Sequence, residues 1–390
     1  MKNINRRDWI KTSMLGIGSI SLLPGNLFGK GEAKAASQLG WSKESMLWEI
    51  NPLYNEIKMK ARLLANENPF GPSPKVQKAI SESISLGNRY GHGDAAYLIS
   101  LLAEKEGVKP ENIMLGPGST DMLEKTAIVL CKDGGNVVSA DPTYMSLVNT
   151  AQAIGGNWKA VPLKKDYSHD LEGMQSAIDG DTKLVYVCNP NNPMGSITEA
   201  SSLKEYCKKA ATKVPIFVDE AYLEFMDKPE DNSMVGLIKE GHDVMVARTF
   251  SKIHGMAGLR IGYLVATEER IKSITSMVRG TMGLCVTSLK GAIASVQDPS
   301  FLTDCRKWNK ESREFTSEQL HSMGFQEIPS YTSFMIFPIE QEGKAFAKKM
   351  MDQGVGIRVY SIADSPWCRV SMGTMDEMKL FVDALKTATA

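Results

Sequence analysis

The chain has 390 residues, 43% of them hydrophobic, which is enough to bury a large core and to form more than one domain. Its 45 Lys and Arg residues balance 45 Asp and Glu residues, so no excess of basic charge indicates nucleic-acid binding. No run of about 18 or more apolar residues occurs, so a membrane-spanning helix is not expected.

The first 35 residues have the composition of an export signal. The paired Arg6 and Arg7 precede an uncharged stretch, residues 12–29, and then the small-residue site Ala33-Lys34-Ala35. This order is typical of a secretory signal peptide, and the arginine pair resembles that of twin-arginine signals, which export folded proteins. We therefore expect residues 1–35 to direct the protein to the periplasm. The alternatives are a general secretory signal or an ordinary basic tail, and with a basic tail the protein would be cytoplasmic.

Residues 76–285 alternate short apolar runs with helical patterns. Continuous apolar runs indicate strands that are buried on both faces, and the alternation predicts an α/β domain with a mostly parallel, seven-stranded sheet. The predicted strands are Ile113–Leu115, Asn136–Ala140, Asn157–Val161, Leu184–Cys188, Pro215–Val218, Val244–Arg248 and Ile261–Val265. The predicted helices between them are Ser119–Cys131, Tyr144–Ile154 and Ala200–Ala210.

After residue 285 the pattern changes. A long helical region is predicted over residues 286–323, and helices are predicted near 343–353 and from Met375 onward. Short strands are predicted at Ser333–Phe337, Val355–Val359 and Cys368–Met372. We expect residues 286–390 to form a smaller α+β domain, and residues 36–75 to be an N-terminal arm that joins it.

Three polar segments follow successive predicted strands. They are the turn at residues 189–195, the Asp219-Glu220-Ala221-Tyr222 segment, and Ser251-Lys252. Ligands of open α/β sheets bind outside the carboxyl ends of the strands, so these segments are expected to meet at one site. A lysine in a partly desolvated pocket is a competent amine nucleophile, and Lys252 is flanked by Phe250 and Ile253.

The other groups of this site suit an anionic, nitrogen-containing cofactor. Asp219 ends an apolar strand and needs a cationic partner, which a protonated pyridine ring would supply. Arg260 offers a planar fork for a phosphate, and Gly118-Ser119-Thr120 opens a helix whose free N–H groups favour an anion. The six cysteines show no metal-ligand spacing, so no metal site is expected.

In this order, the segments resemble the fold-type I pyridoxal-5′-phosphate (PLP) aminotransferases of class I/II, and most of all the histidinol-phosphate aminotransferase family. The resemblance extends from Leu63-Leu64-Ala65-Asn66-Glu67-Asn68-Pro69 to the C-terminus. It implies that Lys252 holds PLP as a Schiff base and shuttles protons, with Asp219 and Tyr222 also in the catalytic group. It also implies two small-molecule substrates, an amino donor and a 2-oxo acid acceptor, and a homodimer.

The resemblance further assigns residues to each part of the cofactor and substrate. Asp219 would pair with the pyridine nitrogen, Asn192 and Tyr222 would bind the ring hydroxyl, and Tyr144 would stack on the ring. The residues implied for the phosphate are Gly118, Ser119, Thr120, Ser251 and Arg260, with Tyr90 reaching it from the neighbouring subunit. Arg369 would bind the substrate carboxylate, and Arg358 a distal anionic group.

The family turn usually reads Asn-Pro-Thr-Gly, whereas this chain has Met194 in place of the Thr, so the substrate pocket could differ. Two further hypotheses remain open. A PLP-dependent decarboxylase of the same fold, similar to threonine-phosphate decarboxylases, is the main alternative. A PLP-binding protein without turnover is the other. The donor itself is not determined, whether a histidinol-phosphate-like or an aromatic compound.

Overall fold

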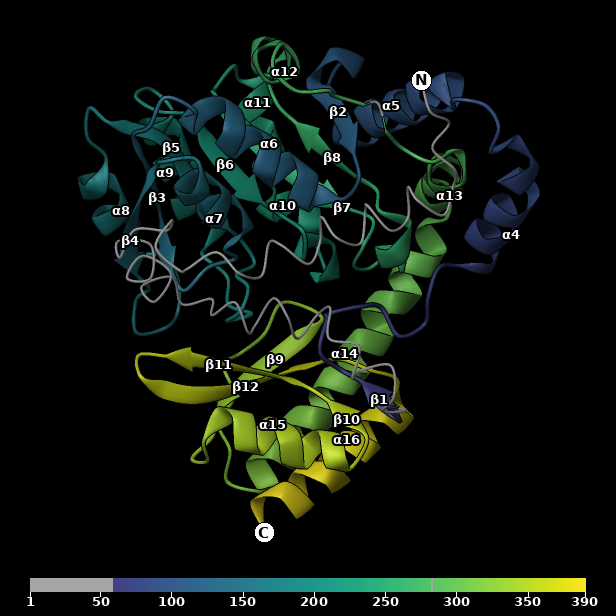
Figure 1. Ribbon diagram of the computed structural model, residues 1–390, viewed down its shortest axis with the longest axis vertical. Coiled ribbons are helices and arrows are strands. Elements are labelled where there is room, and N and C mark those ends of the chain that lie inside the picture. The colour runs from purple at the N-terminus through teal and green to yellow at the C-terminus, as the bar shows by residue number, and fades with distance from the viewer. Residues whose placement is uncertain (1–58, 282) are drawn as a thin grey trace, which may run out of the picture. The chain divides into compact units, whose positions relative to one another are not determined.

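The computed structural model describes residues 59–281 and 283–390, so the predicted signal peptide and most of the predicted N-terminal arm lie outside the described residues. Its main sheet has seven strands in the order β2-β8-β7-β6-β5-β3-β4 (Figure 1). The strands are β2 (Ile113–Gly116), β3 (Asn136–Asp141), β4 (Asn157–Pro162), β5 (Thr182–Cys188), β6 (Ile216–Asp219), β7 (Val244–Thr249) and β8 (Gly262–Val265). Each predicted strand of this sheet is therefore present, within two residues at either end.

The sheet is mostly parallel, as predicted. β8 is antiparallel to both of its neighbours, β7 and β2, whereas the pairs among β3, β4, β5, β6 and β7 are parallel. The central strands β6, β7 and β8 are buried along their whole length, which requires cover on both faces.

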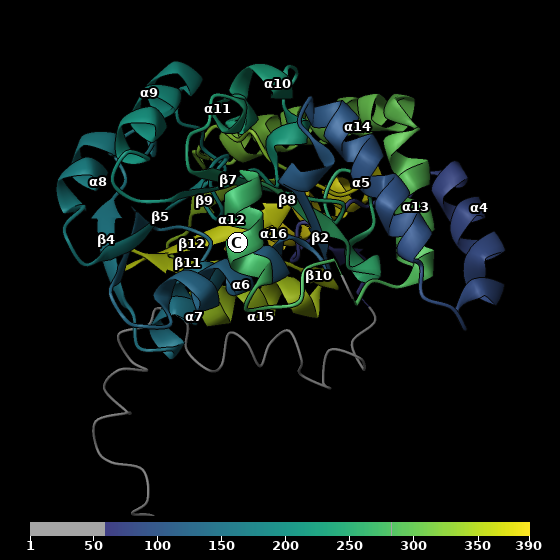
Figure 2. The same ribbon diagram turned by 90° about the horizontal axis from the view of Figure 1, so that it is seen from above.

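Helices provide that cover on both faces (Figure 2). On one face a core of aliphatic side chains joins the sheet to α5 (His92–Glu106), α9 (Ala200–Ala210) and α11 (Val235–Lys239). On the other face α6 (Ser119–Cys131) packs on β2, β5, β7 and β8, and α7 (Ser146–Ala153) packs on β3 and β4. The remaining helices of this part are α4 (Pro74–Ser83), α8 (Leu171–Ala177), α10 (Pro229–Asn232) and α12 (Glu268–Thr275).

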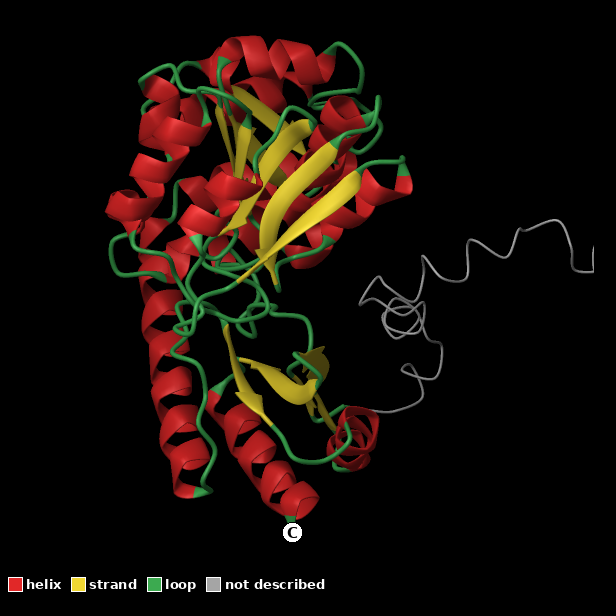
Figure 3. Ribbon diagram, turned by 90° about the vertical axis from the view of Figure 1, so that its left-hand side faces the viewer, coloured by secondary structure: helices red, strands yellow, loops and turns green. Residues whose placement is uncertain are grey.

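The C-terminal part contains a smaller antiparallel sheet. Its order is β11-β12-β9, with β9 (Phe334–Pro338), β11 (Arg358–Ile362) and β12 (Ser365–Ser371). The helices α14 (Pro299–Ser322), α15 (Gly343–Asp352) and α16 (Met375–Thr389) accompany it, and the core includes Phe337, Phe346 and Phe381. β1 (Ala61–Arg62) pairs with β10 (Val355–Gly356), so the chain that precedes the main sheet is built into this part. Figure 3 shows both sheets in yellow with helices in red around them.

Two predicted elements are wrong in detail. The predicted helical region 286–323 is two helices, α13 (Val286–Val296) and α14, because Pro299 occupies the first turn of α14, where its missing N–H costs nothing. The predicted strand Val355–Val359 is divided at Ile357: β10 pairs with β1, whereas β11 pairs with β12. The predicted domain limits at residues 75 and 285 stay predictions. Within the described residues, no helix is both long enough and apolar enough to cross a membrane.

Candidate active site

The three polar segments that follow β5, β6 and β7 lie together at the carboxyl ends of these adjacent parallel strands. The backbone joins them directly. The amide of Asn189 donates to the carbonyl of Asp219 at 3.0 Å, and the amide of Glu220 donates to the carbonyl of Ala247 at 3.0 Å. The meeting of the segments expected from the sequence is therefore present in the structure.

Asp219 is a buried carboxylate, and no Lys or Arg within the described residues forms an ion pair with it at contact distance. Its Oδ1 accepts a hydrogen bond from the amide of Ala221 at 3.1 Å, and its Oδ2 accepts one from the hydroxyl of Tyr186 at 3.4 Å. Burial raises the pKa of Asp219 to about 6, although these hydrogen bonds and Lys252 oppose the rise. A buried carboxylate without a cation is costly, so this position suits a cationic group of a ligand.

Lys252 extends from the turn after β7 toward the same site. Its Nζ lies 3.4 Å from the carbonyl oxygen of Ala65 and 5.4 Å from the centre of the Tyr222 ring. Burial, followed by the nearby positive charge of Arg369, lowers the pKa of Lys252 to about 8. Its amine is therefore neutral at a much lower pH than that of a surface lysine, and the neutral amine is the nucleophilic form.

Tyr222 is held by a residue that the sequence reasoning did not assign to the site. The side-chain amide of Asn66 donates to the Tyr222 hydroxyl at 2.9 Å. Asn66 is itself buried, and its backbone amide donates to the Ser371 hydroxyl at 2.8 Å. Its φ of +53° is a conformation that Asn tolerates better than most residues.

Arg369 is buried, and one N–H of its guanidinium has no partner. Its Nη1 donates to Asn192 Oδ1 at 2.7 Å and its Nη2 to the carbonyl of Leu64 at 3.2 Å, while within the described chain Nε contacts no acceptor. The rings of Phe334 and Tyr360 lie 5.1 and 5.2 Å from the guanidinium carbon. A rigid, dry guanidinium with a free N–H is suited to bind a carboxylate.

Arg358 lies directly opposite Arg369 in the β11–β12 pair. Opposite residues of an antiparallel pair stand on the same face of the sheet, so both arginines belong to the face that carries Tyr360. The structure therefore places the two arginines on one face of the smaller sheet.

Gly118, Ser119, Ser251 and Arg260 form a tight cradle at the start of α6. Arg260 Nη1 donates to the Ser251 hydroxyl at 3.2 Å, and its Nη2 donates to the carbonyl of Pro117 at 3.3 Å. A Cβ on Gly118, whose φ is +86°, would lie only 2.4 Å from Arg260 Nη2. The hydroxyls of Thr120 and Tyr144 meet beside the cradle at 3.4 Å.

Tyr90 is the one predicted site residue that lies apart from the others. Its side chain is 86% exposed, and its ring lies 5.6 Å from the ring of His92. Within one chain it takes no part in the site. No group of three or more His, Cys, Asp or Glu residues that could hold a metal ion occurs in residues 59–281 and 283–390.

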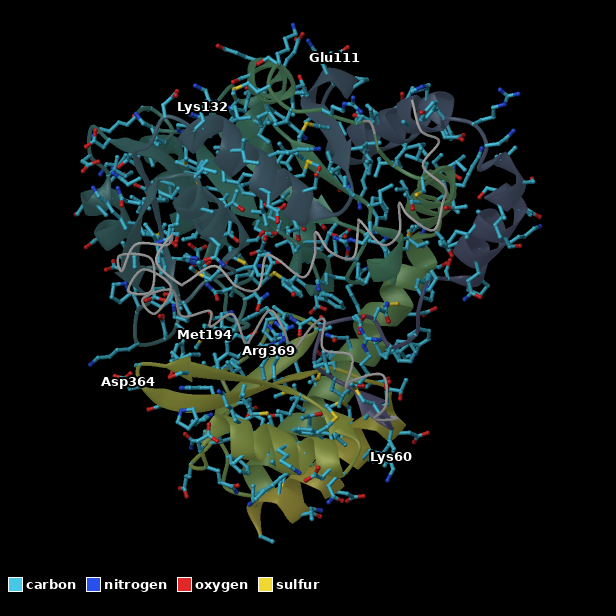
Figure 4. The ribbon with its side chains drawn as sticks, in the orientation of Figure 1. Lys60, Glu111, Lys132, Met194, Asp364 and Arg369 are labelled. Atoms are coloured by element: carbon cyan, nitrogen blue, oxygen red, sulfur yellow. The ribbon has the colours of Figure 1, made fainter. Side chains whose placement is uncertain are left out.

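Met194 belongs to a hydrophobic cluster between the main sheet and the C-terminal part. It is fully buried and packs with Ile328 and Ile336, the latter in β9. Figure 4 labels Met194 and Arg369, which in this view both lie in the zone where these two parts of the molecule meet. The departure from the usual Thr therefore adds apolar contact between the turn at residues 189–195 and β9.

Replacing Met194 by Thr is expected to lower the free energy of unfolding by about 2–4 kcal/mol, because it leaves a cavity and buries a hydroxyl. The half-exposed Met277 gives a matched control, since Met277→Thr should change stability by no more than about 0.5 kcal/mol. Urea denaturation measures both. Equal stabilities for the two variants would contradict the packing role of Met194.

Comparison with known proteins identifies the family. The model of "Aminotransferase class I and II" matches residues 58–385. The chain belongs to the class I and II aminotransferases. It is 33% identical over 336 residues to the histidinol-phosphate aminotransferase of Moorella thermoacetica, covering 86% of each chain. It is 35% identical over 326 residues to that of Brevibacillus brevis, covering 83% of this chain and 89% of the relative.

Solved structures agree with this assignment. The histidinol-phosphate aminotransferase of Sinorhizobium meliloti, determined in complex with pyridoxal-5′-phosphate, is 28% identical, with a TM-score of 0.80, over 89% of this chain and 94% of that chain. L-threonine-O-3-phosphate decarboxylase from Porphyromonas gingivalis, 20% identical with a TM-score of 0.72 over 84% of this chain and 98% of that chain, shares the fold alone. The protein is thus a PLP-dependent aminotransferase with the fold-type I architecture.

Proposed function

We propose that this aminotransferase binds PLP through Lys252 and Asp219 and transfers an amino group from a histidinol-phosphate-like or aromatic donor to a 2-oxo acid. The observation that carries the proposal is that a buried carboxylate without a cation and a lysine with a pKa of about 8 belong to one site. PLP supplies the two groups that these residues lack, a protonatable ring nitrogen and an aldehyde.

The remaining residues fit the rest of the cofactor. Arg260, Ser251 and the first turn of α6 provide charge, hydroxyl groups and free amides for a phosphate, in a cradle too tight for a Cβ at Gly118. Asn192 and Tyr222 would hold the ring hydroxyl, and Tyr144, whose hydroxyl meets that of Thr120, would cover the ring. The fit rests on the buried carboxylate and this cradle.

When bound, PLP acts as an electron sink for the carbon that carries the amino group. The chain's own residues do the rest. Lys252 would hold the cofactor until the substrate amine displaces it. Its freed amine would then move the proton between the two carbon atoms of the 1,3-shift, for which a pKa near the working pH is favourable. Arg369 would hold the carboxylate of an amino acid or 2-oxo acid through its free Nε–H, and its packing against Phe334 and Tyr360 would keep water away.

The names of the relatives support a donor of the histidinol-phosphate type. Histidinol phosphate has no carboxylate, so its phosphate would take the place of one beside Arg369, and Arg358, on the same face, supplies a second cation for it. We expect histidinol phosphate or an aromatic amino acid to bleach the cofactor absorbance band, and a 2-oxo acid to restore it. A donor that instead gives amine and carbon dioxide over many turnovers without any 2-oxo acid would overturn transamination as the main activity.

The pH dependence of cofactor attachment tests the tuning of Lys252. Because the pKa of Lys252 is lowered, its neutral amine forms as the pH rises through about 8. The rate at which cofactor-free protein captures PLP should therefore level off above about pH 8, rather than climb toward the ordinary lysine pKa of about 10.4. Arg369→Ala removes one cause of the lowered pKa of Lys252, so in this variant the midpoint of the rate-against-pH curve should lie at a higher pH. Stopped-flow absorbance measures the capture rate of both proteins. A midpoint near pH 10 for the wild type would contradict the lowered pKa of Lys252.

We also propose that the enzyme is a homodimer in which Tyr90 reaches the phosphate of the neighbouring subunit. Its exposure in one chain supports this role, as do the exposed apolar side chains of Ile84 and Leu86 nearby in the sequence. Sedimentation should give a dimer. Tyr90→Phe should weaken PLP binding but leave the dimer intact. A fully active monomer would overturn the proposal.

Finally, we propose export through the twin-arginine route, which would allow PLP to be bound before transport. The motif around Arg6 and Arg7 supports the proposal. Replacing both arginines by lysine should retain the enzyme in the cytoplasm, as cell fractionation would detect. Unchanged export would point to the general secretory route, and wild-type protein in the cytoplasm to a basic tail.

A further inference from the structure

His254 follows the proposed cofactor lysine by two residues and lies in the same turn, but on its buried side. The carbonyl of Lys252 accepts a hydrogen bond from the amide of Gly255 at 3.0 Å, which closes the turn around His254. The His254 ring is 2% exposed and lies against the ring of Phe250, with 4.6 Å between the ring centres. Both of its ring nitrogens have partners within the protein.

Those partners come from two other segments of the fold. His254 Nε2 lies 3.1 Å from Glu224 Oε2, and its Nδ1 lies 2.7 Å from the hydroxyl of Ser295 in α13. Glu224 is buried as well, and its other oxygen accepts from Lys105 Nζ at 2.7 Å. Burial alone would raise the pKa of Glu224, but Lys105 and His254 hold it well below its usual range. The ionised carboxylate can only accept, so Nε2–H of His254 is the donor.

His254 and Glu224 are equally spaced from two residues of the candidate site. Glu224 follows Tyr222 by two residues, as His254 follows Lys252 by two. Lys252 and Tyr222 meet in the site, with 5.4 Å between the amine and the ring centre, and His254 and Glu224 meet behind it. One hydrogen bond therefore joins the two chain segments whose side chains face the cofactor.

We propose that His254 is a positioning residue, which fixes the Lys252 turn against the Tyr222 segment through its hydrogen bond to Glu224. The proposal rests on the role proposed above for Lys252. Without the bond, the strand ends stay joined by the Glu220–Ala247 backbone bond and the Arg248–Glu220 ion pair. The Lys252 turn beyond them loses its hydrogen bond to Glu224, and the amine loses its fixed approach to the reacting atoms. A displacement of about 1 Å at a reacting group can cost on the order of 100-fold in rate.

The two nitrogens of His254 can be tested separately. Asn can replace the Nδ1 contact to Ser295, whereas Gln can reach the position of Nε2 and keep the bond to Glu224. We expect His254→Asn and Glu224→Met, which has no oxygen acceptor, to lower the rate of the half-reaction with an amino donor by at least about 10-fold, with the donor Kd changed less than about twofold. His254→Gln and Ser295→Ala should stay within about threefold of wild type. Stopped-flow absorbance over a donor titration separates rate from Kd.

A second readout does not need turnover. The rate at which cofactor-free protein captures PLP should fall in the same order, with His254→Asn and Glu224→Met slower than His254→Gln. Thermal unfolding of the cofactor-free variants identifies any variant that fails to fold. If His254→Asn fails to fold, Glu224→Met tests the bond independently.

Equal values for His254→Asn and His254→Gln, whether low or like wild type, would overturn the positioning role, as would a rate like that of wild type in Glu224→Met. If Lys252 is not the attachment point, the result is different, because a variant without Lys252 would then capture PLP at the wild-type rate.

Discussion

Replacing Lys252 by Ala is expected to abolish both the absorbance band of the attached cofactor and transamination. The variant loses its covalent link to PLP and its proton-transfer group together, so turnover should fall by at least about 10⁴-fold, the upper end of the range for general acid–base catalysis alone. Absorbance spectra and a coupled assay with donor and 2-oxo acid measure the two effects on the same sample.

The control is a lysine that is remote from the site. Lys307 is exposed in α14, where it faces Glu311 at 4.0 Å, and Lys307→Ala should keep both the spectrum and the activity. An unaltered spectrum for Lys252→Ala would mean that another lysine carries the cofactor.

Replacing Asp219 by Asn should keep the covalent attachment, because Lys252 is intact, yet lower turnover strongly. The amide cannot hold a proton on the pyridine nitrogen, so the ring becomes a weaker electron sink. Loss of one preorganised electrostatic group of this kind costs on the order of 10²–10³-fold in kcat. Steady-state kinetics with saturating substrates would measure it.

Asp219→Glu serves as the matched variant, since it retains the charge but lengthens the side chain by one methylene. It should recover part of the activity that Asp219→Asn loses. Full activity in Asp219→Asn would contradict the proposed pairing with the ring nitrogen, and equal activities in the two variants would assign the loss to geometry instead of charge.

Local signals in the sequence were sufficient to predict the main sheet. β5 contains the apolar run Leu184–Cys188 and β7 the apolar run Val244–Ala247, and Gly118 precedes the predicted start of α6. The smaller sheet was less predictable, because residues 355–362 divide between two sheets at Ile357, and the partner of β10 is the distant β1. Such pairings depend on tertiary packing, which a single segment does not encode.

The candidate site was likewise predictable from the sequence only in part. Lys252, Asp219 and Arg260 could be predicted because each lies within a few residues of the end of a predicted strand, Lys252 and Asp219 after one and Arg260 directly before one. Asn66 and the pairing of Arg369 with Asn192 could not, since they join segments separated by 156 and 177 residues in the chain. The need for glycine at residue 262 is also purely spatial, because a Cβ there would lie 2.7 Å from the amide nitrogen of Ser119.

The burial of Asp219 also links cofactor supply to the lifetime of the protein. Its pKa is about 6 in the folded chain without ligand, against about 3.9 in an unfolded chain. Because the folded state holds the proton more tightly, this group favours folding below about pH 4, and the advantage is lost as the pH rises through 6. Near neutral pH the desolvated charge thus costs the cofactor-free protein about 3 kcal/mol. A bound pyridinium would remove much of that cost, so molecules that lack PLP should unfold, and be degraded, well before those that carry it.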